Sequence, residues 1–368
     1  MNFLLDSLQA LQWQQVVMWI IGGILIFLAI KKEMEPTLLL PIGFGAILVN
    51  LPNSGAVGEN GILSVLFNIG IEHKFGEMFP LILFIGIGAM IDFGPVLSNP
   101  KLMMFGAAAQ FGIFLTYSLA SMFFSPNDAA SIAIIGAADG PTSIVVAQTL
   151  KSNYMGAIMV AAYSYMALVP IIQPPVIKLL TTKKERMIKM PYKQTDVSQT
   201  TRILFPIIVT VIAGLVAPDS ISLVGFLMFG NLIRECGVLN SLSETAQKVL
   251  ANLITIFLGL TIATKMQAAD FLNLNTLLIL GLGLVAFIFD TAGGVLFAKF
   301  INLFLKNKIN PMIGAAGISA FPMSGRVVHK MALKEDPNNF ILMQSIGVNV
   351  SGQVASVIAG GIILSWFS

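Results

Sequence analysis

The sequence predicts an all-α polytopic membrane protein, and three observations support this fold class. Of the 368 residues, 56% are hydrophobic and only 11% are charged, less than half the share typical of a soluble domain. Apolar segments long enough to cross a bilayer recur along the whole chain. Lys and Arg number 21 against 18 Asp and Glu, too balanced for a nucleic-acid-binding surface. The composition therefore excludes an ordinary soluble enzyme, a disordered chain and a nucleic-acid binder.

About ten to eleven membrane-spanning helices are expected, because a helix needs roughly 20 mostly apolar residues to cross the hydrocarbon core. Five segments meet this length outright: 11–30, 102–124, 155–180, 276–300 and 340–367. Shorter or interrupted candidates are 37–52, 79–97, 203–217, 221–237 and 249–266. Residues 1–10 include Asp6 and are expected to form an interfacial helix rather than a cleaved signal peptide.

Lys and Arg residues indicate which loops face the cytoplasm. The polar stretch from Thr181 to Arg202 holds six of them, so we expect it inside, together with Lys31 and Lys32. The loop 53–61 has neither Lys nor Arg and is expected outside. These placements agree only if the stretch 129–148 enters the membrane and returns, or is otherwise not a simple span.

Two interrupted apolar stretches, 129–148 and 309–326, contain the same word, Ile-Gly-Ala-Ala, starting at Ile135 and at Ile313. Two further pairs of short words recur in the same order, at 44–45 and 229–230 and at 84–87 and 257–260. We therefore predict a first repeat over 1–180, a basic cytoplasmic loop over 181–202 and a second, inverted repeat over 203–368. Inverted repeats with broken helices are typical of secondary transporters.

Asp139 is the first candidate site residue, because a charged side chain at membrane depth costs about 2.5–3.5 kcal/mol and needs a partner. Gly140 and Pro141 interrupt the helix and free backbone carbonyls. Together with the hydroxyls of Thr142 and Ser143, they make an all-oxygen set that suits a hard cation. The alternative is a helix cap in a loop outside the membrane.

The second broken stretch offers Asn310 and Ser319 as neutral oxygen ligands and Arg326 as a fixed positive charge. An Arg guanidinium suits a planar carboxylate, although ordinary cytoplasmic flanking charge explains Arg326 equally well. Asn349 and Gln353 are four residues apart and share a helix face, as site residues or as interhelical contacts.

Three other residues are too polar for their apolar surroundings. Asp290 is a second intramembrane carboxylate, either an ion or proton site or a structural partner for a Lys or Arg. Tyr163 and Tyr165 lie two residues apart in one apolar segment and are not expected both to face lipid.

The chain has neither a Walker A nor a Gly-x-Gly-x-x-Gly motif, so a gradient or a partner protein is expected to supply the energy for transport.

These stretches resemble the β subunits of the sodium-ion-translocating decarboxylases, which include oxaloacetate, methylmalonyl-CoA, glutaconyl-CoA and malonate systems. The resemblance covers essentially the whole chain. It rests on the segment 136–142 around Asp139 and on a set of spaced residues: Tyr165, Asn310, Gly314, Ser319, Arg326 and Asn349.

The resemblance implies a carboxybiotin decarboxylase that exports Na+ and consumes a proton, in the inner membrane of a bacterium. Its implied catalytic residues are Arg326, Asp139 and Tyr165, and carboxybiotin would contact Arg326 and Ser319. The implied Na+ ligands are Asp139, Asn310, Gly314, Ser319 and Asn349.

The implied partners are a biotin carrier, a carboxyltransferase α subunit and a small membrane-anchoring subunit, so biotin is not attached to this chain. Gly-rich faces on the early spans permit a homo-oligomer. The short chain favours an acyl-CoA system over an oxaloacetate system. The competing class is a stand-alone Na+/H+ antiporter or Na+-coupled organic-anion carrier, which would share the inverted repeat and the intramembrane aspartate.

Overall fold

The computed structural model describes residues 9–33, 36–58, 60–72, 78–190 and 196–367, and all regular structure in these ranges is helical. Seven helical segments are long and apolar enough to cross a membrane: Trp13–Lys32 (α2), Pro100–Ala120 (η2 to α8), Met155–Leu180 (α11), Gln199–Val216 (α13), Asn240–Lys265 (α15 to η6), Leu274–Phe304 (α18) and Leu342–Phe367 (α20). Shorter apolar helices are Pro36–Val49 (α3), Ile62–Ile71 (α4 and η1) and Met78–Met90 (α5). The polytopic all-α class is thus confirmed.

The shorter helical elements either lie within these segments, where a segment is interrupted, or lie between them. They are α6 (Gly94–Ser98), η2 (Pro100–Leu102), α7 (Met103–Ala109), α8 (Phe111–Ala120), α9 (Pro126–Ala133), η3 (Ile134–Ala137), α10 (Gly140–Thr149), α12 (Lys183–Arg186), η4 (Pro218–Ser220), α14 (Ile221–Glu235), α15 (Asn240–Glu244), η5 (Thr245–Leu250), α16 (Ala251–Ile262), η6 (Ala263–Lys265), α17 (Ala268–Phe271), η7 (Pro311–Gly317) and α19 (Met323–Glu335). An interfacial helix was predicted for residues 1–10, and residues 1–8 of this stretch lie outside the described residues.

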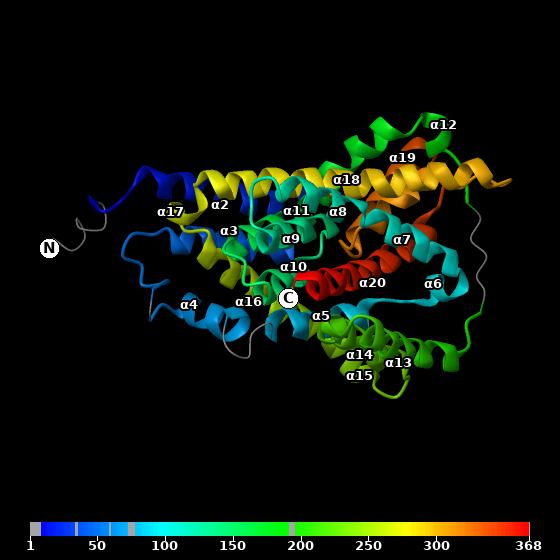
Figure 1. Cartoon of the computed structure of the whole chain (residues 1–368), viewed down its shortest axis with the longest axis horizontal. Coiled ribbons are helices and arrows are strands. Elements are labelled where there is room, and N and C mark those ends of the chain that lie inside the picture. Colours follow the sequence, from blue (N-terminus) through cyan, green and yellow to red (C-terminus); the bar gives the residue numbers. More distant parts are fainter. Residues whose placement is uncertain (1–8, 34–35, 59, 73–77, 191–195, 368) are drawn as a thin grey trace.

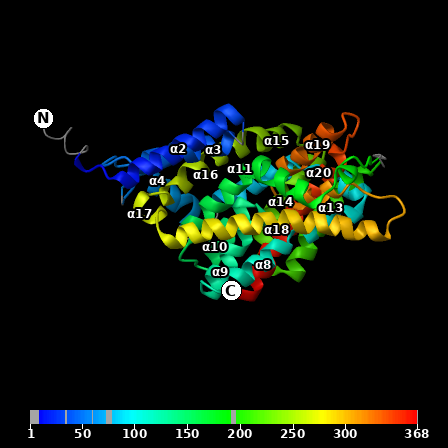
Figure 2. The same cartoon turned by 90° about the horizontal axis from the view of Figure 1, so that it is seen from above.

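The long helices run along the length of the molecule, with α18 extending across most of it (Figure 1). Helices α12 and α19 lie at one end, and α4 and α17 lie at the other (Figure 1; the perpendicular view is Figure 2). Arg186 of α12 pairs with Glu335 of α19 at 2.7 Å, and Lys299 of α18 pairs with Glu185 at 3.2 Å. We call the end of the molecule that contains α12 and α19 the basic end, because it holds Lys- and Arg-rich segments that were predicted to be cytoplasmic.

The predicted span 102–124 corresponds to the candidate membrane segment Pro100–Ala120, whose helix is interrupted once. Helix α7 ends at Ala109 and α8 begins at Phe111, with the buried Gln110 between them. The Gln110 amide donates to the carbonyl of Gly106 at 3.1 Å and to that of Gly317 at 3.5 Å. This interruption is hard to predict, because a single polar residue in an apolar run does not by itself interrupt a helix.

Both stretches that were expected to be broken are interrupted. The first passes from α9 through the 3₁₀ turn η3 to Ala138, whose φ of 54° is left-handed, before α10 starts. Pro141 occupies the first turn of α10, where a missing N–H costs nothing. The second passes from the 3₁₀ helix η7 to α19. The backbone N–H of Ser319 donates to the carbonyl of Ala137 at 3.0 Å, so the two broken stretches meet directly.

Several helix contacts occur in matching pairs, in each of which a helix from the first half of the chain and a helix from the second half exchange places. Helix α3 packs against α16 and α14 packs against α5, while α11 packs against α18 and α20 against α7. Neighbouring helices also match, since α2 lies on α3 and α13 lies on α14. This pattern surrounds the junction of the two broken stretches with long helices on several sides.

Candidate functional site

Asp139 lies at the junction of the two broken stretches and is the N-cap of α10. Its side chain is only 2% exposed, and no basic side chain pairs with it among the described residues. The local sequence explains the position: the left-handed Ala138 ends the 3₁₀ turn, and Gly140 and Pro141 begin the next helix. The predicted helix cap is therefore real, but it is buried inside the protein rather than exposed in an external loop.

The two carboxylate oxygens of Asp139 have unequal surroundings. Oδ2 accepts hydrogen bonds from the hydroxyl of Thr142 at 2.8 Å, the amide of Gln353 at 3.0 Å and the hydroxyl of Ser356 at 2.8 Å. Oδ1 accepts only a long bond, at 3.4 Å, from the Thr142 backbone N–H. An ionised carboxylate has about four acceptor positions. Oδ1 therefore retains lone pairs that a cation can use.

Helix α20 connects this carboxylate to the second broken stretch. Asn349 donates its amide to the carbonyl of Ile318 at 2.7 Å, and Ser319 donates its hydroxyl to that of Gly352 at 3.1 Å. Gln353 lies one turn further along and binds Asp139. The amide oxygen of Asn349 is buried and has no hydrogen-bond partner among the described residues. A buried acceptor without a donor is costly, and a cation would satisfy it.

The two tyrosines of α11 have different neighbours. The ring of Tyr163 packs against Gly140, where a Cβ would lie 2.5 Å from it, and its buried hydroxyl has no partner in the described ranges. Tyr163 also lies close enough to interact with the charge of Asp139. Tyr165 instead donates its hydroxyl to the carbonyl of Leu280 on α18. The geometry thus places Tyr163, rather than Tyr165, beside the carboxylate.

Asn310 is separated from this cluster. Its amide donates to the carbonyls of Arg186 at 2.8 Å and Ile188 at 3.1 Å, and its side-chain oxygen accepts from the N–H of Met312. The seven residues of η7 rise by roughly 14 Å between Asn310 and the junction. In this conformation Asn310 caps η7 at the basic end and does not face Asp139.

Gly314 serves close packing. A Cβ at this position would lie 2.0 Å from the carbonyl oxygen of Gly294 on α18, and a Cβ on Gly294 would lie equally close to the Gly314 carbonyl. The two backbones touch, so η7 sits directly on α18. In this conformation the backbone of Gly314 is therefore engaged with α18, and its predicted role as a Na+ ligand stays a prediction.

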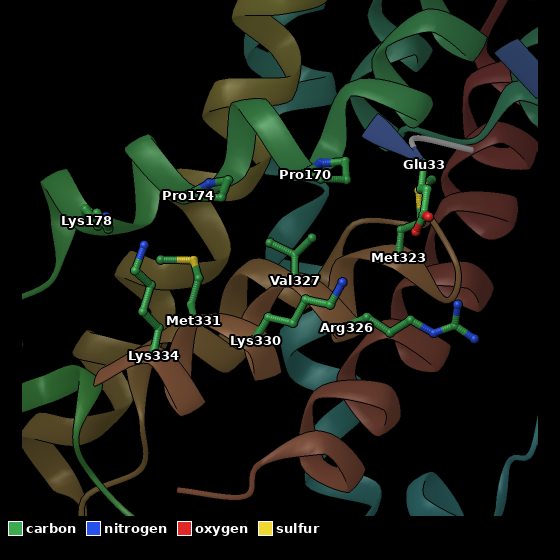
Figure 3. Close-up of a pocket in the computed structure, with 10 residues that line it drawn as sticks. All are labelled: Glu33, Pro170, Pro174, Lys178, Met323, Arg326, Val327, Lys330, Met331 and Lys334. Atoms are coloured by element: carbon green, nitrogen blue, oxygen red, sulfur yellow. The ribbon is translucent and has the colours of Figure 1, made fainter. Parts of the chain in front are cut away.

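Arg326 lies on the first turns of α19, is exposed and forms no ion pair within the described part of the chain. It lines a cleft of about 340 Å³ at the basic end, formed mainly by α11 and α19 (Figure 3). It therefore lies outside the Asp139 cluster, seven residues beyond Ser319 along the same segment.

Asp290 is fully buried in α18, and its carboxylate lies against the backbones of Gly112 and Gly136. No Lys or Arg pairs with it in the described ranges, so the predicted structural ion pair is not formed. An ion or proton site remains as the other prediction for this residue.

Sequence reasoning missed Ser356. The missed signal was the spacing of Asn349, Gln353 and Ser356, which falls on one helix face at intervals of four and three residues.

The helical fold, the broken membrane segments and the buried, unpaired carboxylate define a polytopic membrane protein of the ion-translocating class. A family model described as the Na+-transporting oxaloacetate decarboxylase beta subunit matches residues 14–367. The chain belongs to this family.

Related proteins carry several substrate names. The chain is 47% identical to the methylmalonyl-CoA decarboxylase subunit beta of Propionigenium modestum, over 96% of this chain and 94% of the relative. It is also 47% identical to the glutaconyl-CoA decarboxylase subunit beta of Acidaminococcus fermentans, over 97% and 94%. Identity to a probable oxaloacetate decarboxylase beta chain of Vibrio cholerae is 43%, over 97% and 96%.

Proposed function

We propose that this chain removes CO2 from carboxybiotin presented by a partner subunit and couples that step to Na+ export. In the reaction the N–C bond of carboxybiotin breaks, CO2 leaves and the biotin nitrogen takes up a proton from the far side of the membrane. Family membership supports this class of function. The site observation that carries it is Oδ1 of Asp139, which accepts one long hydrogen bond from the described residues and lies at the meeting point of the two broken stretches.

The oxygen atoms at this junction suit Na+. Asp139 supplies a charge and Asn349 an amide oxygen without a partner among the described residues. Ser319 of the second broken stretch and Tyr163 of α11, which packs against Gly140, add hydroxyls. Hard cations prefer such oxygen ligands. Asn310 and Gly314 belong to this site only if η7 moves, because in this conformation both are engaged elsewhere.

We also infer that the chain consists of two inverted repeats, 1–180 and 203–368, joined by the basic loop. The reciprocal helix pairs support this, since exchanging α3 for α14 and α5 for α16 turns one contact into the other. The same holds for α11 with α18 and α20 with α7. Such a pseudo-twofold arrangement supports alternating access about a fixed central site.

Arg326 is proposed to hold the carboxylate of carboxybiotin at the basic end. Its guanidinium can donate two parallel hydrogen bonds to a carboxylate. When CO2 leaves, a negative charge that favoured the cation-loaded, inward-facing state disappears near Arg326. Its loss favours the outward-facing state, from which Na+ leaves on the far side of the membrane. Moving one charge against 100 mV costs about 2.3 kcal/mol, a load that decarboxylation can carry.

The complex that we propose contains a biotin carrier, a carboxyltransferase α subunit, a small membrane-anchoring subunit and further copies of this chain. The substrate is proposed to be an acyl-CoA, because identity is 47–48% to the methylmalonyl-CoA and glutaconyl-CoA subunits and 42–44% to the oxaloacetate chains. Alignment to the Vibrio cholerae chain also needs 419 positions, against 357 for the glutaconyl-CoA subunit.

The test is radioactive Na+ uptake into inverted vesicles that hold the chain with its biotin-carrier partners, with CO2 release followed in the same sample. We expect each process to require the other. Na+ movement driven by a proton gradient, without a biotin partner, would instead identify the competing stand-alone antiporter.

A further inference from the structure

We propose that the cleft between α11 and α19 is the entry site for the carboxylated biotin arm, and that Lys330 and Lys334 guide its anionic end toward Arg326. The inference rests on the proposed function and adds two positioning residues to it. Arg326, Lys330 and Lys334 are spaced by four residues, so they form one row on α19. Over eight residues this row spans about 12 Å.

The row faces the cleft. Lys330 and Lys334 project from α19 toward α11, which contributes Pro170, Pro174 and Lys178 to the opposite wall (Figure 3). The guanidinium of Arg326 extends past one end of the row, on the side where Glu33 lies (Figure 3). Among the residues that the structure describes, four cationic side chains and one carboxylate, that of Glu33, line the cleft.

Within the described ranges, these cations differ from their neighbours at the basic end because they have no acidic partner. Arg186 pairs with Glu335 at 2.7 Å, and Lys189 pairs with Asp336 at 3.1 Å. Both acids follow Lys334 directly in sequence, yet both turn to other partners. Lys178, Arg326, Lys330 and Lys334 form no ion pair with any described residue. Unpaired cations along a cleft create a field that attracts an anion.

The walls between the charges are apolar. Pro170, Pro174, Val327 and Met331 line the cleft between the cationic ends, and Met331 is mostly buried. The volume of about 340 Å³ lies within the range of small-molecule clefts. An organic carboxylate at the end of an aliphatic arm matches both features, since the arm can contact the apolar walls while its charge follows the row. A free inorganic anion would use the charges but not the walls.

The experiment measures initial decarboxylation rates of the whole complex at several concentrations of the carboxylated carrier. It is run in vesicles of neutral phosphatidylcholine and, in parallel, in vesicles that also contain anionic lipid. The test variant is Lys330→Gln with Lys334→Gln. Its matched control is Lys183→Gln with Lys184→Gln, two exposed lysines on α12 that do not line the cleft. We expect the test variant to raise KM for the carrier roughly threefold to tenfold, to weaken its salt dependence and to leave kcat largely unaltered. Glu33→Gln should lower KM.

The outcomes separate this inference from the proposed function. Turnover by the unaltered complex, with an unchanged KM in the Lys330/Lys334 variant, would overturn the inference alone. An equal rise in KM for the Lys183/Lys184 control would overturn it too, because the effect would then be general surface charge. An effect confined to vesicles that contain anionic lipid would show that the row binds lipid headgroups instead. Absence of turnover in the unaltered complex would overturn both proposals.

Discussion

Asp139→Asn should abolish Na+ dependence while leaving the fold intact. The amide keeps an oxygen for the three donors on Oδ2, from Thr142, Gln353 and Ser356. Each bond weakens from about 1.5–3 kcal/mol to about 0.5–1.5 kcal/mol, a total loss of about 3–4.5 kcal/mol for the three bonds. Removing a buried charge recovers about 2.5–3.5 kcal/mol, so the free energy of unfolding should fall by no more than about 2 kcal/mol. Na+ loses its proposed carboxylate ligand, and its affinity should fall at least about a hundredfold.

The assay compares CO2 release and Na+ uptake over a range of Na+ concentrations in inverted vesicles, with thermal unfolding measured in detergent on the same preparations. Asp128→Asn is the control. That carboxylate is also buried, but it accepts from Ser125, Ser152 and Asn153 at the other end of α9. The control should lose stability and keep the half-saturating Na+ concentration. Na+ stimulation of Asp139→Asn at the unaltered protein's half-saturating concentration would refute the assignment of Asp139 as a cation ligand.

Three further results are expected. Gly314→Ala places a Cβ 2.0 Å from a backbone oxygen and should lower the free energy of unfolding by about 3 kcal/mol or more. Its control, Gly281→Ala, adds a Cβ in open space and should raise the free energy of unfolding by up to about 1 kcal/mol. Thermal melting curves of the two variants test this difference. Tyr163→Phe removes a hydroxyl without a partner, so thermal stability should hold while the half-saturating Na+ concentration rises; an unchanged concentration contradicts its place at the site. Burial raises the pKa of Glu185, but hydrogen bonds from Thr182 and Lys299 lower it more, to below its ordinary value of 4.5. The stabilisation that ionised Glu185 gives to the folded state is therefore present above pH 4.5 and is lost as the pH falls through the folded pKa. Glu185→Gln should lower the free energy of unfolding by about 0.5–1 kcal/mol at pH 7 and should not change it in strong acid. Thermal melting at the two pH values tests this prediction.

Local sequence signals were enough to find the broken stretches and Asp139. A Gly-Pro pair after a carboxylate stops one helix and starts another wherever it occurs, and the cost of a buried charge does not depend on the details of packing. For the same reason the long spans 155–180 and 340–367 lie within two residues of α11 and α20. Local motifs and the length of apolar runs could therefore predict this part of the fold.

The membership of the site depended on contacts that the sequence does not encode locally. Asn310 and Ser319 are nine residues apart, but a 3₁₀ helix, longer per residue than an α-helix, carries Asn310 away from the junction. Tyr163 and Tyr165 have the same chemistry, and only the rotation of α11 decides which one meets Gly140. Ser356 is an ordinary small polar residue until α20 brings it to Asp139.

The arrangement also indicates how an event at Arg326 can reach a buried cation site. Arg326 and Ser319 belong to one short segment that includes the turn before α19. Gln173 of α11 fixes this segment by donating to the carbonyl of Ala315 at 2.7 Å and to the hydroxyl of Ser324 at 3.0 Å. Beyond it, Ser319 binds the backbone of the first broken stretch two residues before Asp139. A displacement of this segment, caused by loss of charge at Arg326, would therefore move Ser319, a proposed cation ligand. No apolar core has to be rearranged between the two sites, and such a direct connection is the physical requirement for coupling them.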